Sequence, residues 1–98
     1  MTRDEIIATI RTNAKAIQAE GVRKLWLFGS RARGDHREDS DIDVLVDIAP
    51  DVAFSLHNLV GVQHIIEDAT GLPTQATMKD SLKPRVAERI SDDLLEVF

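Results

Sequence analysis

Two short apolar runs, separated by a charged segment, constrain the fold of this chain more than any other feature. Residues 24–28 read KLWLF and residues 42–46 read IDVLV. Each run is too short for a typical helix, the first stops sharply at Gly29, and the second is rich in β-branched residues. The pattern predicts two buried strands, with residues 30–34 forming a turn or a single helical turn after the first.

Apolar residues at helical spacing predict three helices around these strands. The first covers residues 3–20, because residues 2–5 (TRDE) form a capping-box pattern and isoleucines recur at helical spacing before the stop at Gly21. The second covers residues 52–69, and a last helix follows Asp80. Since neither strand contains enough apolar surface to fold alone, we expect the helices to pack against them.

The remaining elements are a weaker strand and an ambiguous tail. Residues 74–78 form a candidate strand, and Pro73 before them suits an edge or a strand start. Residues 94–98 fit either a helix end or a strand. The order of elements predicts an α/β mixed (α+β) fold with a small mixed β-sheet packed with helices, in a single domain over residues 1–98.

Composition and charge exclude several classes of protein. The 98 residues contain no cysteine, which excludes a disulfide framework, a thiolate metal site and a cysteine nucleophile. The first residues lack the layout of a signal peptide, and no apolar run is long enough to span a membrane, so we expect a cytoplasmic protein. The net charge of −5 argues against broad binding to nucleic-acid phosphates.

Two aspartates at the start of the second strand form a candidate metal site. Residues i and i+2 of a strand point to the same face, so Asp41 and Asp43 are expected to project together while Ile42 and Val44 face the core. Because like charges repel and aspartate is disfavoured in strands, this pair requires a functional explanation. A divalent cation with a preference for oxygen ligands, Mg²⁺ or Mn²⁺, would provide one.

The end of the first strand is a candidate phosphate site. Gly29 allows the backbone to approach a ligand closely, Ser30 adds a hydroxyl donor, and Arg31 or Arg33 would supply positive charge. If the two strands are neighbours, the phosphate and metal sites lie side by side. That layout suits a metal-bound nucleoside triphosphate.

Other motifs in the same segment fail on single residues. A P-loop is excluded because Asp35-His36 stand where Lys and Ser/Thr are required. An EF-hand loop is excluded because Val44 stands where it needs glycine. The other acids of the segment, Asp35, Glu38 and Asp39, are best explained as a solvated loop.

The combined motif resembles that of a known family. Gly29-Ser30, ten further residues and Asp41-x-Asp43 match the GSx10DxD signature of the minimal nucleotidyltransferases, members of the DNA polymerase β-like nucleotidyltransferase superfamily. The surrounding segments LFGSRARG, SDIDVLV and SLKPRVAERI agree with it. The resemblance implies the nucleotidyltransferase fold and an antitoxin role. The partner of such antitoxins is a HEPN-family toxin. Several of these antitoxins transfer AMP from ATP to a tyrosine of the toxin.

The resemblance also implies roles for individual residues. Asp41 and Asp43 would be catalytic and would bind Mg²⁺ (or Mn²⁺), while Gly29 and Ser30 would hold the triphosphate. Of the two nearby arginines, Arg33 is our own candidate for nucleotide binding. The metals would clamp the reacting α-phosphate and the attacking hydroxyl. Because the chain contains no tyrosine, a tyrosine acceptor must lie on a partner.

One position departs from the family pattern. Gln75 stands where the family supplies a third carboxylate, which completes the metal site and helps to deprotonate the acceptor. A positioned general base is typically worth roughly 10²–10⁴-fold in rate, and a neutral amide cannot act as one. Two hypotheses follow: a working nucleotidyltransferase with two carboxylates, or a scaffold with weak or no activity that neutralises the toxin by binding it.

Overall fold

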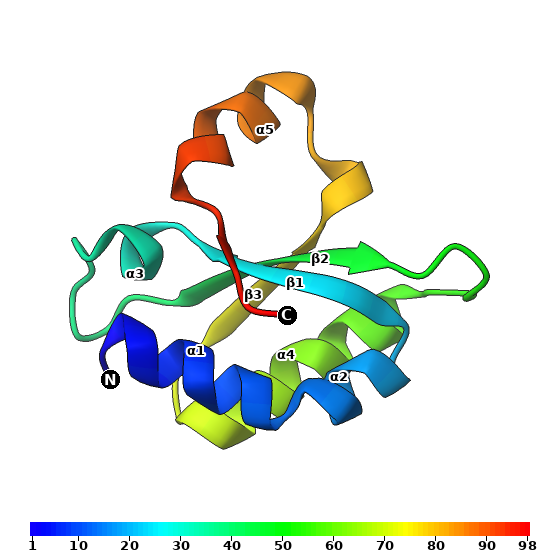
Figure 1. The fold of residues 1–98 in the computed structure, drawn as a ribbon, viewed down its shortest axis with the longest axis horizontal. Coiled ribbons are helices and arrows are strands. Elements are labelled where there is room, and N and C mark those ends of the chain that lie inside the picture. Colours follow the sequence, from blue (N-terminus) through cyan, green and yellow to red (C-terminus); the bar gives the residue numbers. More distant parts are fainter.

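The computed structural model describes residues 1–98 and contains one four-stranded sheet in the order β3-β2-β1-β4 (Figure 1). The central strands are β1 (Val22–Phe28) and β2 (Ile42–Ile48), and the edge strands are β3 (Thr74–Met78) and β4 (Leu95–Glu96). β2 and β3 are parallel, whereas β1 is antiparallel to both of its neighbours. The predicted small mixed sheet is therefore confirmed.

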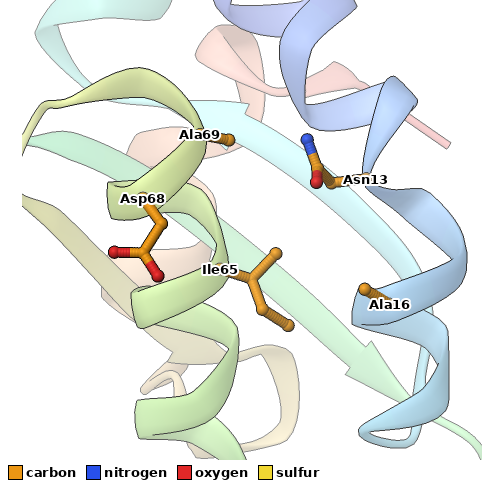
Figure 2. A pocket seen from close by; sticks show the side chains of 5 residues that line it. All are labelled: Asn13, Ala16, Ile65, Asp68 and Ala69. Carbon is orange, nitrogen blue, oxygen red and sulfur yellow. The ribbon is translucent and has the colours of Figure 1, made fainter.

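Helices α1 (Arg3–Thr12), α2 (Ala14–Ala19) and α4 (Leu56–Thr70) cover one side of the sheet, and α5 (Pro84–Ile90) stands on the other side (Figure 1). Short helical turns complete the fold and are α3 (Ser30–Arg33), η1 (Lys79–Ser81) and η2 (Ser91–Asp93). None of the helices is both long enough and apolar enough to cross a membrane. A cavity of about 370 Å³ lies between α2 and α4, where Ile65 faces Asn13 and Ala16 (Figure 2).

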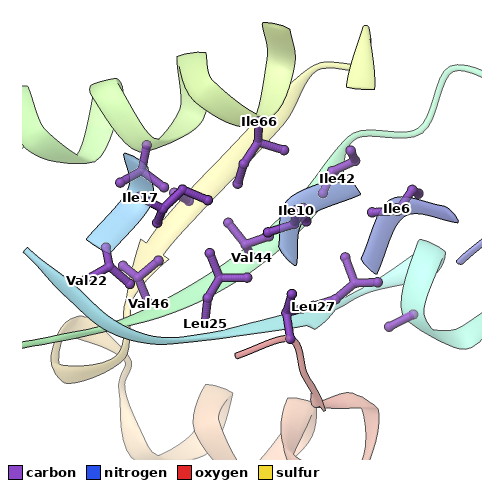
Figure 3. Close-up of a cluster of buried hydrophobic side chains, with 14 residues drawn as sticks. Ile6, Ile10, Ile17, Val22, Leu25, Leu27, Ile42, Val44, Val46 and Ile66 are labelled. Carbon is purple, nitrogen blue, oxygen red and sulfur yellow. The ribbon is translucent and has the colours of Figure 1, made fainter. Parts of the chain in front are cut away.

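The hydrophobic core fills the space between these three helices and the sheet (Figure 3). Strand β2 contributes Ile42, Val44 and Val46, which are all fully buried. Because side chains alternate along a strand, the intervening Asp43 and Asp47 belong to the opposite face. The core therefore fixes which face of the sheet presents the acidic residues.

The predicted first helix is wrong in one respect, because it is broken at Asn13. The chain turns there with φ −102° and ψ 14°, and the Asn13 side chain donates a hydrogen bond to the Thr9 carbonyl oxygen at 2.9 Å. The predicted capping box is confirmed, since the Thr2 backbone N–H and the Glu5 carboxylate bond at 3.0 Å. Both halves still bury isoleucines of the same stripe, at positions 6, 10 and 17.

Other boundaries also differ from expectation. Helix α4 begins at Leu56 and not at residue 52, because the Ser55 backbone N–H donates to Asn58 Oδ1 at 3.0 Å and so caps the helix. The ambiguous tail is a strand. It pairs Leu95 with Leu27, and the Val97 N–H donates to the Leu25 carbonyl oxygen at 2.8 Å.

Candidate active site

The pairing of the two central strands brings Gly29 beside Asp43. Phe28, the last residue of β1, is the register partner of Asp43 on β2. Gly29 then adopts φ 79° and ψ −159°, a region that glycine alone occupies readily. A Cβ atom at this position would overlap Asp43 Oδ2. Glycine is therefore required here both by the backbone and by the carboxylate packed against it.

Asp43 is half-buried, and Asp41 is exposed. Burial is the main cause that raises the pKa of Asp43, the charge of Asp41 raises it further, and the guanidinium of Arg33 lowers it. Asp41 lies one residue before β2, and Asp43 is the second residue of that strand. The negative charge of Asp41 acts on Asp43, so the two acids form one electrostatic unit.

This acidic pair fits a single hard divalent cation. Two neighbouring carboxylates repel each other, and a cation bound between them removes the repulsion. Carboxylate oxygens suit Mg²⁺ or Mn²⁺. No group of three or more Asp, Glu, His or Cys side chains gathers to hold a metal ion, so the protein's own ligands would be these two acids.

The basic residues of the site differ sharply in their availability. Arg33 is exposed and forms ion pairs with Asp35 at 3.1 Å and with Asp93 at 3.0 Å, and these partners raise its pKa, Asp35 most strongly. Arg31 is 2% exposed and its guanidinium is bonded to main-chain carbonyls of the following loop. Of the two arginines considered for phosphate binding, only Arg33 faces solvent near the acids.

Ser30 opens α3 directly after Gly29, so its hydroxyl lies on the segment that follows the Gly29–Asp43 contact. The sheet thus gathers Gly29, Ser30, Asp43 and the nearby Arg33 at one end of β1 and β2. None of these residues lines the cavity between α2 and α4. The candidate site therefore lies on the face of the sheet on which α5 stands, and the cavity lies on the side covered by α1, α2 and α4.

Gln75 is the register partner of Asp43 across the parallel pair of β2 and β3. The third strand therefore carries an exposed neutral amide directly beside the half-buried carboxylate. Asp47, the other acid of β2, is engaged by Arg23 at 2.5 Å. The site consequently contains two carboxylates, and no third acid of the sheet is free to join them.

Comparison with known proteins shows which family the chain belongs to. A family model described as the nucleotidyltransferase domain matches residues 7–97. The chain belongs to the nucleotidyltransferase family. This nucleotidyltransferase domain is 33% identical over 98 residues to the protein adenylyltransferase MntA of Thermococcus cleftensis, and the alignment covers 99% of this chain and 97% of that one. It is thus a homologue of MntA.

Solved structures agree with this assignment. A minimal nucleotidyltransferase is similar with a TM-score of 0.71 at 26% identity, covering 97% of the domain and 95% of that chain. A chain from the complex of a tri-AMPylated HEPN toxin with an MNT antitoxin, from Shewanella oneidensis, is similar with a TM-score of 0.69 at 13% identity, covering 99% and 72%. The second match shows the fold alone. Membership of the family implies a nucleotide substrate and a divalent metal in general.

Proposed function

We propose that this chain is an antitoxin that transfers AMP from Mg-ATP to a tyrosine hydroxyl of a cytoplasmic HEPN-family toxin and so neutralises it. Homology to a protein adenylyltransferase along nearly the whole chain supports the reaction, and the S. oneidensis complex motivates the partner. The observation that carries the proposal is the contact of the Asp43 carboxylate with Gly29, beside Asp41. It joins a metal site to a phosphate-binding segment.

Each residue has a distinct role in this proposal. Asp41 and Asp43 hold Mg²⁺, while the Gly29 backbone and the Ser30 hydroxyl contact the triphosphate. Arg33 adds a positive charge next to the acids, where it already lowers the pKa of Asp43. Bound Mg²⁺ neutralises part of the triphosphate charge and orients the α-phosphate.

The transfer exchanges one phosphorus–oxygen bond for another. The tyrosine oxygen forms a bond to the α-phosphorus of ATP, the bond from that phosphorus to the bridging β-oxygen breaks, and pyrophosphate leaves. The phenolic proton passes to solvent, because Gln75 cannot accept it. This chain contains no tyrosine, so the acceptor belongs to the toxin.

A second candidate function rests on Gln75. Its position beside Asp43 leaves the site one carboxylate short, and this favours a scaffold that neutralises the toxin by binding without turnover. The net charge of −5 would complement a basic, RNA-cleaving partner. The two candidates share the partner and differ in whether the partner is modified.

Intact-mass spectrometry separates the two candidates. The purified chain is incubated with the toxin encoded beside it, Mg²⁺ and ATP, and both proteins are weighed. The transferase predicts that the toxin gains one or more increments of about 329 Da, the mass of an added AMP. Asp41→Asn and Asp43→Asn should abolish the gain, whereas Asp39→Asn, an acid of the adjoining loop, should not.

The outcomes assign the function directly. Modification that depends on Asp41 and Asp43 establishes the transferase, and fragmentation of the toxin then identifies the modified residue. An unmodified toxin in a stable complex with the chain overturns transfer and supports the binding scaffold. In that case Asp43→Asn should leave neutralisation of the toxin intact.

A further inference from the structure

Arg31 is a buried charged residue without a carboxylate partner. Only 2% of it is exposed, and none of the ion pairs of the chain includes it. Buried arginines are usually paired with acids, because an isolated charge is costly away from water. Arg31 instead donates from Nε to the Ser40 carbonyl oxygen at 3.0 Å and from Nη2 to the Glu38 carbonyl oxygen at 3.2 Å.

The first of these acceptors belongs to the peptide unit that leads into Asp41. The Ser40 carbonyl and the Asp41 amide form one planar peptide group. A hydrogen bond to the Ser40 carbonyl therefore also restrains the backbone of Asp41. Asp41 lies before β2 and is outside the ladder of that strand. The next fixed point is Ile42, whose N–H donates to the Pro73 carbonyl oxygen at 2.8 Å. Asp41 is thus held between the Arg31 bond and the start of the sheet.

The restraint matters because the two acids of the site repel each other. In a free loop, Asp41 would move away from Asp43 and the pair would not be preformed for a cation. An arginine fork spans two carbonyls in fixed geometry, which the single ammonium of lysine cannot reproduce. The Ser40 side chain closes the loop further by accepting the Arg37 backbone N–H at 2.8 Å.

We propose that Arg31 is a positioning residue of the metal site, which fixes the 38–41 segment so that Asp41 stands beside Asp43. The inference deepens the proposed function and rests on its metal site, but not on turnover. Arg31 itself touches neither nucleotide nor metal. Its effect is transmitted through the Ser40–Asp41 peptide.

Binding of Mn²⁺ to the purified chain, followed by electron paramagnetic resonance, tests this role without any transfer reaction. Outer-shell groups that orient ligands typically contribute 10–100-fold to metal affinity. We expect Arg31→Gln to raise the Mn²⁺ Kd by on the order of 10-fold, and Arg31→Lys to raise it less. Arg11→Gln is the matched control, since Arg11 also donates to a main-chain carbonyl, that of Val97 at 2.7 Å, but on the β4 side of the fold.

A second readout follows the loop in the absence of metal. The Ser40 N–H donates to the Arg37 carbonyl oxygen at 3.1 Å, so its hydrogen exchange reports whether the loop is closed. Exchange at Ser40 should accelerate in both Arg31 variants and remain unchanged in Arg11→Gln. If Arg31→Gln does not fold, Arg31→Lys decides by both readouts.

Four results would overturn the inference or separate it from the proposed function. An unchanged Mn²⁺ Kd in a folded Arg31 variant overturns it, and so does an equal loss of affinity in Arg11→Gln. A wild-type chain that binds no Mn²⁺ overturns both the metal site and the role of Arg31. A wild-type chain whose Mn²⁺ binding depends on Asp41 and is weakened by the Arg31 variants, but which does not modify the toxin, leaves the inference standing and removes only the transfer.

Discussion

Asp43 carries a negative charge in surroundings that disfavour it. Its pKa is raised above the ordinary 3.8 by burial first and by Asp41 second, so the folded chain holds this proton more tightly than the unfolded chain does. The stability that depends on Asp43 is therefore complete below pH 3.8 and is lost as the pH rises through the raised value. At neutral pH and without metal, the charged Asp43 destabilises the fold.

Replacing Asp43 by asparagine should consequently stabilise the metal-free protein. We expect Asp43→Asn to raise the Tm by a few degrees at neutral pH in the presence of a chelator, because the amide carries no charge to desolvate. The gain should vanish in acid, where the wild-type carboxyl is protonated. Calorimetry across this pH range measures it, with Asp39→Asn as the control. A Tm at or below that of the wild type at neutral pH would contradict the assigned environment.

Gly29 and Gly34 differ in why glycine is needed: both have a positive φ, but only Gly29 is also packed against another side chain. Both have positive φ, but a Cβ on Gly34 meets nothing within 4 Å, whereas a Cβ on Gly29 overlaps Asp43. Gly34→Ala should cost about 1 kcal/mol from the left-handed backbone alone. Gly29→Ala should cost about 2–4 kcal/mol and should also displace Asp43. Urea unfolding and Mn²⁺ affinity measure both effects, and equal costs would exclude a contact-specific role for Gly29.

Gln75 offers a gain-of-function change at the position beside Asp43. If the chain is a transferase that lacks its base, Gln75→Asp should raise the rate of AMP transfer by roughly 10²-fold or more. Gln75→Asn is the matched control, since it has the size of aspartate without its charge. Initial rates with the toxin measure the effect. No increase in Gln75→Asp would show that this position does not supply the missing carboxylate.

Among the secondary-structure elements, the three longer strands were easier to predict from the sequence than the break in the first helix and the short last strand. The alternation and β-branching of β2 predicted a strand, and the third strand was predicted at its observed bounds. The break at Asn13 was not predictable from periodicity, because the isoleucine stripe continues across it. Strand β4 has only two residues and exists through its long-range pairing with β1, which no local pattern reports.

Local sequence patterns also predicted only part of the candidate site. The acids, the glycine and the position of Gln75 followed from motif and spacing, and the observed register puts Gln75 beside Asp43. The burial of Arg31 could not be predicted from the sequence, because Arg31 and Arg33 lie in one charged run. Their difference in burial depends on the return of residues 38–41 over α3, which buries one guanidinium and leaves the other exposed. Burial of that kind is a property of tertiary structure.

The segment from η1 to η2 shares one ion pair with the site, between Asp93 and Arg33. Helix α5 has no fully buried residue, and η2 contacts α3 through Asp93 and Arg33. A carboxylate on Arg33 competes with a phosphate for the same donors. Asp93→Asn should therefore lower the Kd for nucleotide by roughly two- to fivefold, as expected for an exposed pair.

Asp92 supplies the control for this change, because it is adjacent, exposed and outside the ion pairs of the chain. Asp92→Asn should leave the Kd nearly unchanged when ATP binding is measured by calorimetry in the presence of Mg²⁺. A Kd that rises in Asp93→Asn would mean that Asp93 instead orients Arg33 toward the phosphates.

The two faces of the sheet have different roles in the molecule. The helical side holds the core and the cavity between α2 and α4, and the opposite side holds the acids and Gln75. Because the core is built without the acidic pair, metal binding should add to stability without being required for folding. The chain without metal is therefore expected to fold, which distinguishes it from domains that depend on a structural metal.

Metal and nucleotide should then raise the Tm by mass action. A ligand at 100 times its Kd stabilises the folded state by about 2.7 kcal/mol, which corresponds to a rise of roughly 10–20 °C for a domain of this size. Mg²⁺ with a non-hydrolysable ATP analogue should produce this rise in the wild type and little of it in Asp43→Asn, although that variant is the more stable of the two without ligand. This reversal of order is specific to a site at Asp43, since non-specific ion binding would shift both proteins equally. Thermal scans of both proteins with and without ligand decide it, and parallel shifts would place the nucleotide elsewhere on the molecule.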